Sequence, residues 1–392
     1  MRDFSDIGAI HVRLTAPEIR RLYATRDPRI LSVVANRPIG GPALSNSTVL
    51  VNMPSAWNAG YRAAGQYIVV MDTGINKNHA MFQMNGATKI THEGCYGSNT
   101  SDRIYQSICP SAQPNGDSNF GTPNSGAPTD NYECAANIRE ECSHGTHVAG
   151  IAAGRASSSL NLQGVAPDAY LVSMQVFSQR ISYPNLRYFN ADLLAALGDT
   201  LILGTSLAGP NPVTVNMSLD GPLFAGNCPA ADTAISNRVQ DLISRTVPVI
   251  AAAGNAGNKT SLAFPSCIPN VTKVGSVLND ASGVSLSGFS NIGIPGNFSG
   301  PILLAPGQTI RSSSVRDING FGGNTKTLEI QGTSQAAPHV AGLYAAVKAT
   351  NPIMSVADAT AWIVGTGSFP VTYALPAPTG TQTYRRIKVP NF

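Results

Sequence analysis

The sequence predicts an α/β fold built on a doubly wound, mostly parallel sheet with helices on both faces. The first observation is a series of continuous apolar runs of strand length that lack the polar alternation of a half-exposed strand. The second is that helical segments lie between these runs, a pattern typical of βαβ units. The third is composition: 43% of the 392 residues are hydrophobic and 12% are charged, which favours a large core over disorder.

Five apolar runs are expected to form buried strands of this sheet, and three longer segments are expected to form its helices. The strand segments are Tyr67–Met71, Tyr170–Val176, Val213–Met217, Val247–Ala252 and Val271–Val277. The helical segments are Ala191–Leu203, Ala230–Arg245 and Ser334–Thr350. We assign all of them to one large domain, residues 45–392.

Residues 1–44 are expected to form a small separate α+β unit. A short strand at Ala9–Val12 is followed by a helix start at Thr15, where Glu18 completes a capping box. A second strand is expected at Ile30–Val34.

Six cysteines, an even number in a loop-rich chain, predict up to three disulfides and an oxidising compartment. Free thiols in a cytosolic protein are the alternative, and the lack of a CxxC pair disfavours a metal site. Residues 91–142 hold four of the six and are expected to form a Cys-rich insertion. Spacing leaves the pairing of these four open: Cys95, Cys109, Cys134 and Cys142.

Charge and hydropathy exclude two classes of partner. The net charge of +4 comes without a long basic run, which argues against nucleic-acid binding. No stretch approaches the roughly 20 apolar residues that span a bilayer. Because Met1–Asp6 has no apolar core behind a basic start, we see no signal peptide and expect a secreted precursor to begin further upstream.

Four polar residues stand where catalytic groups gather in such folds. Asp72 ends the first buried strand, and functional residues collect at the carboxyl ends of parallel strands. His144 begins a small-residue helical segment, and Ser334 lies at a helix N-terminus, where backbone N–H groups favour negative charge. Asn255 follows a buried strand in a Gly-rich turn. Taken singly, each has a structural alternative, such as a turn Asp, an N-cap Ser or a turn Asn.

Two further histidines are expected to be structural. His147 lies one turn after His144, but a metal site is disfavoured because no Glu follows the first histidine as in HExxH. His339 is interpreted in the same way.

Together, the segments around Asp72, His144, Asn255 and Ser334 resemble the subtilisin family of serine proteases, in that chain order and over roughly residues 45–392. The resemblance implies that Ser334 is the nucleophile, that His144 is the general base and that Asp72 orients it. It further implies that the side chain of Asn255 and the backbone N–H of Ser334 bind the oxyanion.

The resemblance also implies a primary specificity pocket between two wall segments. They are Ser218, Leu219 and Asp220 on one side and Ala252, Ala253 and Gly254 on the other, with Ala263 at the floor. The family usually has Gly where this chain has Asp220, which would narrow the pocket, add negative charge, or leave an exposed turn residue. From the family we expect apolar side chains before the cleaved bond.

Further implications concern processing and cofactors. Residues 8–40 resemble the C-terminal half of the family's inhibitory prosegment, which implies a self-processed zymogen cut near Gly41 to Ser47. The resemblance also implies a Cys228–Cys267 disulfide. We expect a monomer that is extracellular or periplasmic and acts on proteins or peptides. Catalysis should need no cofactor, and a structural calcium ion is allowed although no ligand pattern matches one.

Three other functions are alternatives to peptide hydrolysis for this chain. A catalytically inactive relative serving as a binding module is disfavoured by the complete set of four residues. A lipase or esterase is disfavoured because no GxSxG motif surrounds Ser334. Peptide ligation or transpeptidation by the same residues stays open.

Overall fold

The computed structural model describes residues 2–4, 9–11, 15–25, 27, 43–109, 120–121, 124–127, 139–180, 185–207, 213–228, 233–280, 283–317, 320–321, 323–375 and 379–392. The chain divides into two units, Met1–Gly41 and Pro42–Phe392. The strand expected at Ile30–Val34 and the cysteine Cys134 lie outside the described residues.

The N-terminal unit contains a strand pair and one helix. Strand β1 (Arg2–Phe4) pairs antiparallel with β2 (Ala9–His11), and α1 spans Ala16–Thr25. The helix begins where the capping box predicts: Glu18 Oε2 accepts hydrogen bonds from the backbone N–H and the hydroxyl of Thr15, both at 2.6 Å.

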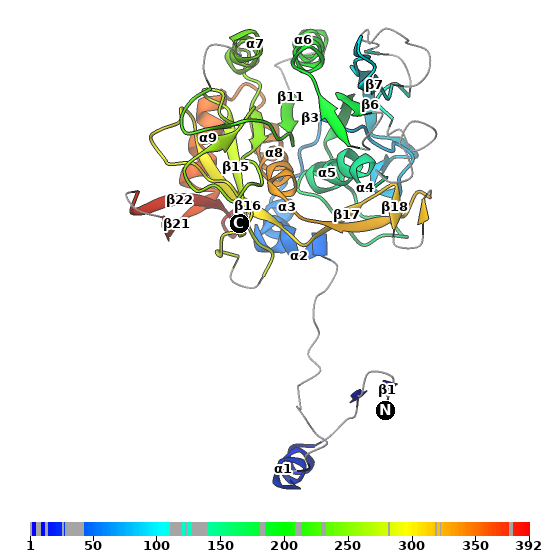
Figure 1. Cartoon of the computed structure of the whole chain (residues 1–392), viewed down its shortest axis with the longest axis vertical. Helices are drawn as coiled ribbons and strands as arrows, with labels where there is room; N and C mark the ends of the chain where they lie inside the picture. Colours follow the sequence, from blue (N-terminus) through cyan, green and yellow to red (C-terminus); the bar gives the residue numbers. More distant parts are fainter. Residues whose placement is uncertain are drawn as a thin grey trace. The chain divides into compact units, whose positions relative to one another are not determined.

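The second unit is built around a nine-stranded sheet in the order β21-β22-β16-β15-β13-β11-β3-β8-β6 (Figure 1). All neighbouring pairs are parallel except β21 with β22. The strands are β3 (Tyr67–Asp72), β6 (Ile90–Cys95), β8 (Tyr170–Gln175), β11 (Val213–Met217), β13 (Val249–Ala252), β15 (Thr272–Leu278), β16 (Ile302–Gln308), β21 (Ser368–Ala374) and β22 (Thr381–Ile387). This confirms the predicted mostly parallel α/β fold.

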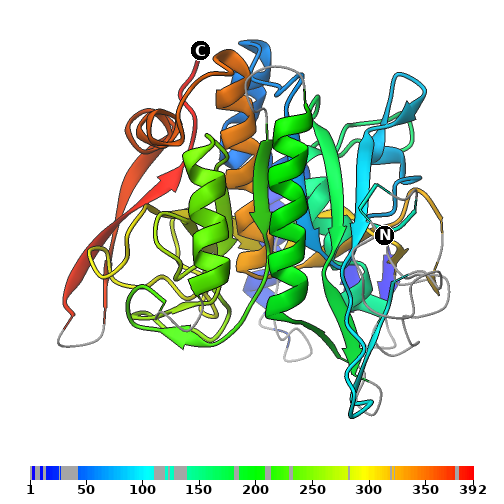
Figure 2. The same cartoon turned by 90° about the horizontal axis from the view of Figure 1, so that it is seen from above.

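Helices cover both faces of this sheet. Figure 2 shows α6 and α7, in green, side by side on one face, with α8, in orange, behind the sheet. Helix α5 packs against α8 on that second face. The bounds are α2 (Ala43–Leu50), α3 (Met53–Asn58), α4 (Arg139–Cys142), α5 (His144–Ala153), α6 (Asn190–Ser206), α7 (Thr233–Ser244), α8 (Thr333–Thr350) and α9 (Val356–Gly365).

Strand β3 shows why the buried strands carry apolar residues without polar alternation. Ile68 and Val70 belong to the core on the α5 and α8 side, whereas Val69 and Met71 belong to the core on the α6 and α7 side. Successive side chains of a strand point to opposite faces, so a strand covered on both sides can bury apolar residues at successive positions, as β3 does from Ile68 to Met71.

Helix α8 runs through the interior: its residues 333–348 are all buried. Small residues allow its close approach to α5. A Cβ added at Gly342 would lie 2.7 Å from Val165 Cβ and 2.8 Å from the carbonyl oxygen of Ala152, so a larger residue would push the segments apart.

The remaining strands of this unit are short and form small sheets of their own. One group is three-stranded, in the order β10 (Leu186–Tyr188), β9 (Phe177–Arg180) and β7 (Tyr105–Ser107). The pairs are β4 (Gln83–Met84) with β5 (Ala87–Thr88), β12 (Leu223–Phe224) with β14 (Leu262–Ala263), β17 (Ile310–Ser313) with β20 (Thr327–Ile330), and β18 (Arg316–Asp317) with β19 (Gly320–Phe321). A short 3-10 helix, η2, spans Ala80–Phe82.

The predicted insertion at residues 91–142 begins too early. Its first residues belong to β6, which pairs with β8 at the edge of the main sheet. Sequence patterning missed this strand because it is not a continuous apolar run: it carries the polar residues His92 and Glu93, and Glu93 is buried.

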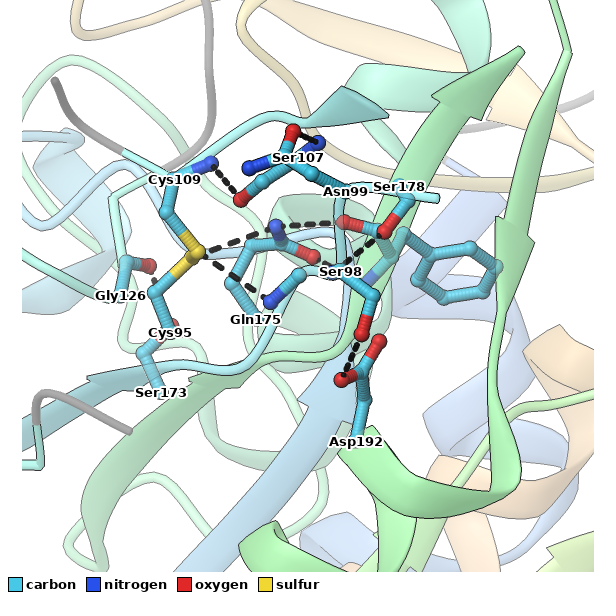
Figure 3. Close-up of a disulfide and its surroundings, with 12 residues drawn as sticks. Cys95, Ser98, Asn99, Ser107, Cys109, Gly126, Ser173, Gln175, Ser178 and Asp192 are labelled. Atoms are coloured by element: carbon cyan, nitrogen blue, oxygen red, sulfur yellow. Dashed lines mark hydrogen bonds between the residues drawn. A yellow bond between two sulfur atoms is a disulfide. The ribbon is translucent and has the colours of Figure 1, made fainter. Parts of the chain in front are cut away.

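Two disulfides are described. Cys228 is bonded to Cys267, as the resemblance implied, and Cys95 is bonded to Cys109, which spacing alone left open. Figure 3 shows that the second lies among polar groups: Gln175 Nε2 donates to Cys95 Sγ at 3.4 Å. The bond therefore ties the end of β6 to the segment that follows β7.

None of the helices within the described ranges has both the length and the apolar composition required to cross a bilayer.

Candidate active site

The site begins where β3 ends, at Asp72. Its carboxylate is fully buried and lies against the ring of His144 at the start of α5, with Nδ1 at 2.8 Å from Oδ1 and 3.0 Å from Oδ2. The backbone N–H of Thr73 donates to Oδ1 at 2.7 Å. The carboxylate is therefore held in place from its own strand while it faces the imidazole.

Burial and the charge of Asp72 act on the pKa of His144 in opposite directions. Burial lowers the pKa of His144, but the negative charge of Asp72 and the hydrogen bond to it outweigh burial, so the pKa lies above the ordinary histidine value. The His144 side chain keeps 23% of its surface exposed, so solvent or a ligand can reach it.

Thr73 also fixes the start of α5. Its hydroxyl accepts a hydrogen bond from the backbone N–H of Gly145 at 2.9 Å. A Cβ at Gly145 would lie 2.5 Å from the carbonyl oxygen of Gly74 and 3.1 Å from Asp72 Cβ, so only glycine lets the helix approach the strand this closely. Sequence reasoning did not identify Thr73; its place directly after Asp72 is the one available signal.

Ser334, in the first turn of α8, lies at the same edge of the sheet because it contacts Ser218, the residue that follows β11. Met217 pairs with Met71 in the β11–β3 register, so the next residues, Ser218 and Asp72, follow on neighbouring strands. Ser218 Oγ donates to the carbonyl oxygen of Ser334 at 2.8 Å, and Ser334 Oγ donates to the carbonyl oxygen of Ser218 at 3.4 Å. Within the described residues Ser334 has no hydrogen bond to His144.

Asn255 lies beside the start of α8. Its Oδ1 accepts hydrogen bonds from the backbone N–H of Thr333 at 2.8 Å and from the Thr333 hydroxyl at 3.1 Å. Because the carbonyl oxygen of the amide is occupied, its Nδ2 is left as the donor. Thr333 was not identified from the sequence, although it directly precedes Ser334.

The expected wall segments lie next to these groups. The side chains of Leu219, Ala252 and Ala253 belong to the hydrophobic cores, so these residues can face a ligand only through their main chains. Asp220 is exposed, and Gly254 adopts φ +99°, a conformation that favours glycine.

The other two histidines of the helix segments have structural partners. His147 Nε2 lies 3.0 Å from the carbonyl oxygens of Ile310 and Leu328. His339 is hydrogen bonded to the carbonyl oxygen of Gln335 and to Ser47 Oγ, both at 2.9 Å. Burial lowers the pKa of His147 to about 3 and that of His339 to about 4, so both rings are neutral near pH 7.

In the part of the chain that the structure describes, no three His, Cys, Asp or Glu side chains lie together as a ligand group. One cluster of main-chain carbonyls holds an ammonium group instead: Lys273 Nζ donates to the carbonyl oxygens of Ile268, Val271 and Ser299.

Comparisons with known proteins agree with this geometry. The model of the subtilase family matches residues 63–383. Subtilisin BL from Lederbergia lenta is 29% identical over 306 residues, covering 78% of this chain and 84% of that protein. M-protease from Shouchella clausii (strain KSM-K16) is 27% identical over 367 residues, covering 91% and 73%.

Solved structures show the same fold. A structure described as S41 Psychrophilic Protease superposes with a TM-score of 0.57 at 26% identity, covering 78% of this chain and 84% of that one. The family match covers most of the chain, and the fold agrees with it. The chain therefore belongs to the subtilase family and is a serine endopeptidase.

Proposed function

We propose that this protein hydrolyses peptide bonds in proteins through an acyl-enzyme, with Ser334 as nucleophile, His144 as general base and Asp72 as the group that orients the imidazole. The observation that carries the proposal is the pairing of His144 Nδ1 with Asp72 at 2.8 Å. This bond engages Nδ1 and leaves Nε2 as the ring nitrogen that can accept a proton from Ser334.

The reaction then proceeds in two balanced halves. Ser334 Oγ bonds to the scissile carbonyl carbon, its proton passes to His144, and the same proton is given to the leaving amine as the C–N bond breaks. Water then loses a proton to His144 and attacks the ester carbon. The bond from that carbon to Ser334 Oγ breaks, which releases the acid, and His144 returns its proton to the Ser334 oxygen. The raised pKa of His144 suits a base that must hold this proton transiently.

The oxyanion would be bound by Asn255 Nδ2 and the backbone N–H of Ser334. The hydrogen bonds from Thr333 to Asn255 Oδ1 support this assignment, because they set the orientation of the amide before substrate arrives. Donors that are oriented in advance stabilise charge in the transition state without reorganisation.

The hydroxyl of Ser334 donates to Ser218 in the free protein. In the proposed complex, the substrate main chain lies along Ser218–Asp220 as an added strand, and a substrate N–H takes over the Ser218 carbonyl. The Ser334 hydroxyl is then released toward His144. The bond to Ser218 is long, at 3.4 Å, so little is lost when the hydroxyl turns to His144.

We further propose that residues 1–44 are part of an inhibitory prosegment, that residues 45–392 are the peptidase domain, and that self-cleavage falls near Gly41 to Ser47. Gly41 itself lies outside the described residues. Export to the extracellular space or the periplasm is supported by the two disulfides, which persist in oxidising compartments. Family members are generally monomeric and need no cofactor for catalysis.

The test is labelling with a serine-directed phosphonate fluoride, location of the adduct by mass spectrometry, and an assay of casein hydrolysis. We expect one adduct, on Ser334, and loss of labelling and hydrolysis in Ser334→Ala. Ser244→Ala, which changes an exposed serine of α7, is the matched control and should keep both. A protein that binds casein without cleaving it or taking up label would instead be an inactive binding module.

A further inference from the structure

The carboxylate of Asp220 reaches from one wall segment of the proposed specificity pocket to the other. Asp220 ends the segment that begins at Ser218, but its Oδ1 lies 3.2 Å from where a Cβ on Gly254 would be. The backbone N–H groups of Gly221 and Asn255 also act on this carboxylate and lower its pKa. The side chain of Asp220 therefore lies against both segments.

Gly254 makes this position available. A Cβ at Gly254 would lie 2.4 Å from Asn291 Nδ2 and 2.7 Å from Ala263 Cβ, so no side chain fits there. The floor residue Ala263 and the carboxylate of Asp220 consequently both lie close to the Cβ position of the same glycine. A substrate side chain that enters between the two segments meets both.

The charge of Asp220 is not neutralised by a neighbouring side chain. Among the described residues no Lys, Arg or His forms an ion pair with it. Arg187 exerts only a distant attraction on the carboxylate, and its own Nη1 donates to the carbonyl oxygen of Leu186 at 2.8 Å. A carboxylate offers about four lone-pair sites, so two N–H donors leave acceptor capacity for a ligand.

The residue as a whole is exposed, but its carboxylate lies against Gly254, and partial burial of the carboxylate raises the pKa of Asp220. The backbone N–H groups of Gly221 and Asn255 partly offset this effect. An apolar substrate side chain placed against the carboxylate would remove more water and return no hydrogen bond. A cationic side chain would supply a charge-assisted hydrogen bond, which is about twice as strong as a neutral one.

We propose that Asp220 is a specificity-determining residue that selects substrates with lysine or arginine immediately before the cleaved bond. The proposal rests on the proposed function and replaces the apolar preference expected from the family. The proposal also explains why this chain has Asp220 where the family usually has glycine. The carboxylate of Asp220 places a negative charge in the space beside Gly254, which an apolar substrate group would otherwise enter.

The test uses peptides that differ only in the residue before the cleaved bond, which is lysine, arginine, norleucine or glutamate. Norleucine keeps an unbranched aliphatic chain but lacks the ammonium group. We expect kcat/KM of the wild-type protein to be about 10- to 100-fold higher for lysine than for norleucine, as one charge-assisted hydrogen bond allows. Asp220→Asn should reduce this ratio to near 1 and Asp220→Gly should reverse it.

Asp241→Asn, which removes an exposed carboxylate of α7, is the control and should keep the wild-type ratio. Phosphonate labelling of Ser334 is measured on every variant, so that loss of folding is distinguished from loss of selectivity. If labelled wild-type protein prefers norleucine and Asp220→Asn leaves the ratio unchanged, this proposal is wrong while the proposed function stands. If no variant is labelled or cleaves any peptide, both fail.

Discussion

Ser218 and Ser334 are joined by two reciprocal hydrogen bonds, each from the hydroxyl of one residue to the main-chain carbonyl of the other, at 2.8 and 3.4 Å. The shorter bond holds the main chain of Ser334 at the start of α8. The longer one engages the hydroxyl that the proposed reaction uses. Ser218 thus positions the proposed nucleophile, and its carbonyl is the group that the proposed substrate main chain would take over from the Ser334 hydroxyl.

Ser218→Ala should slow the reaction of Ser334. The substitution removes the 2.8 Å bond and leaves Asn216 Nδ2, which donates to Ser218 Oγ at 2.9 Å, without that acceptor. We expect the rate of phosphonate labelling to fall about 10-fold, equivalent to one lost buried hydrogen bond. Labelling reactions quenched at successive times and analysed by mass spectrometry measure this rate, and Ser244→Ala is the control. Lower thermal stability with an unchanged labelling rate would assign Ser218 a purely structural role.

Asp72→Asn should reduce activity and move its pH dependence. The carboxylate of Asp72 raises the pKa of His144, and the proposed base must be neutral to accept a proton. Without that charge the ring stays neutral at lower pH, so the acid limb of the kcat/KM profile shifts to lower pH. The maximal turnover should fall by about 10⁴-fold, the size found for this kind of substitution in serine proteases. A profile that keeps the wild-type acid limb would contradict the assignment of His144.

Asp192→Asn should stabilise the protein at neutral pH. Burial raises the pKa of Asp192 to about 6, although Ser98 Oγ donates to its Oδ1 at 2.7 Å, and its Oδ2 is buried without a partner. The folded state therefore binds a proton more tightly than the unfolded state. The stabilisation that comes from protonating Asp192 is complete below about pH 4 and is lost as pH rises through about 6.

Removal of this ionisation should raise the free energy of unfolding by about 1 to 3 kcal/mol at pH 7.5 and change it little at pH 4. Urea unfolding at both pH values, in a Ser334→Ala background that prevents self-digestion, measures the difference. An equal change at the two pH values would show that the effect does not come from the ionisation of Asp192.

Lys273→Met should destabilise the fold. Lys273 is fully buried, and its ammonium group donates to carbonyl oxygens including that of Val271 at 2.7 Å. Loss of the donor leaves buried acceptors unpaired, at about 1 to 3 kcal/mol for each. Lys259→Met is the matched control, because Lys259 also donates to carbonyl oxygens but is partly exposed. Thermal unfolding of both variants should show the larger loss for Lys273→Met; equal losses would refute the argument from burial.

Sequence patterning was most informative where a segment is enclosed on both sides. The segments Tyr67–Met71 and Val213–Met217 are predicted as strands and match β3 and β11 closely, and all their residues except Tyr67 are buried. Enclosure alone was not sufficient, because β16, which is buried over residues 302–307, was not predicted. Strand β6 was assigned to the insertion, and β21 and β22 were not predicted, because all three mix polar with apolar residues.

The sequence by itself determined the fold class, the family resemblance and the order of Asp72, His144, Asn255 and Ser334, because these depend on local patterns. Only the tertiary structure decided which groups touch. The pairing of Cys95 with Cys109, the contact between Ser218 and Ser334 and the placement of Asp220 beside Gly254 all join distant segments. Such contacts follow from strand register and from the absence of a side chain at single glycines, and neither is expressed in a local sequence pattern.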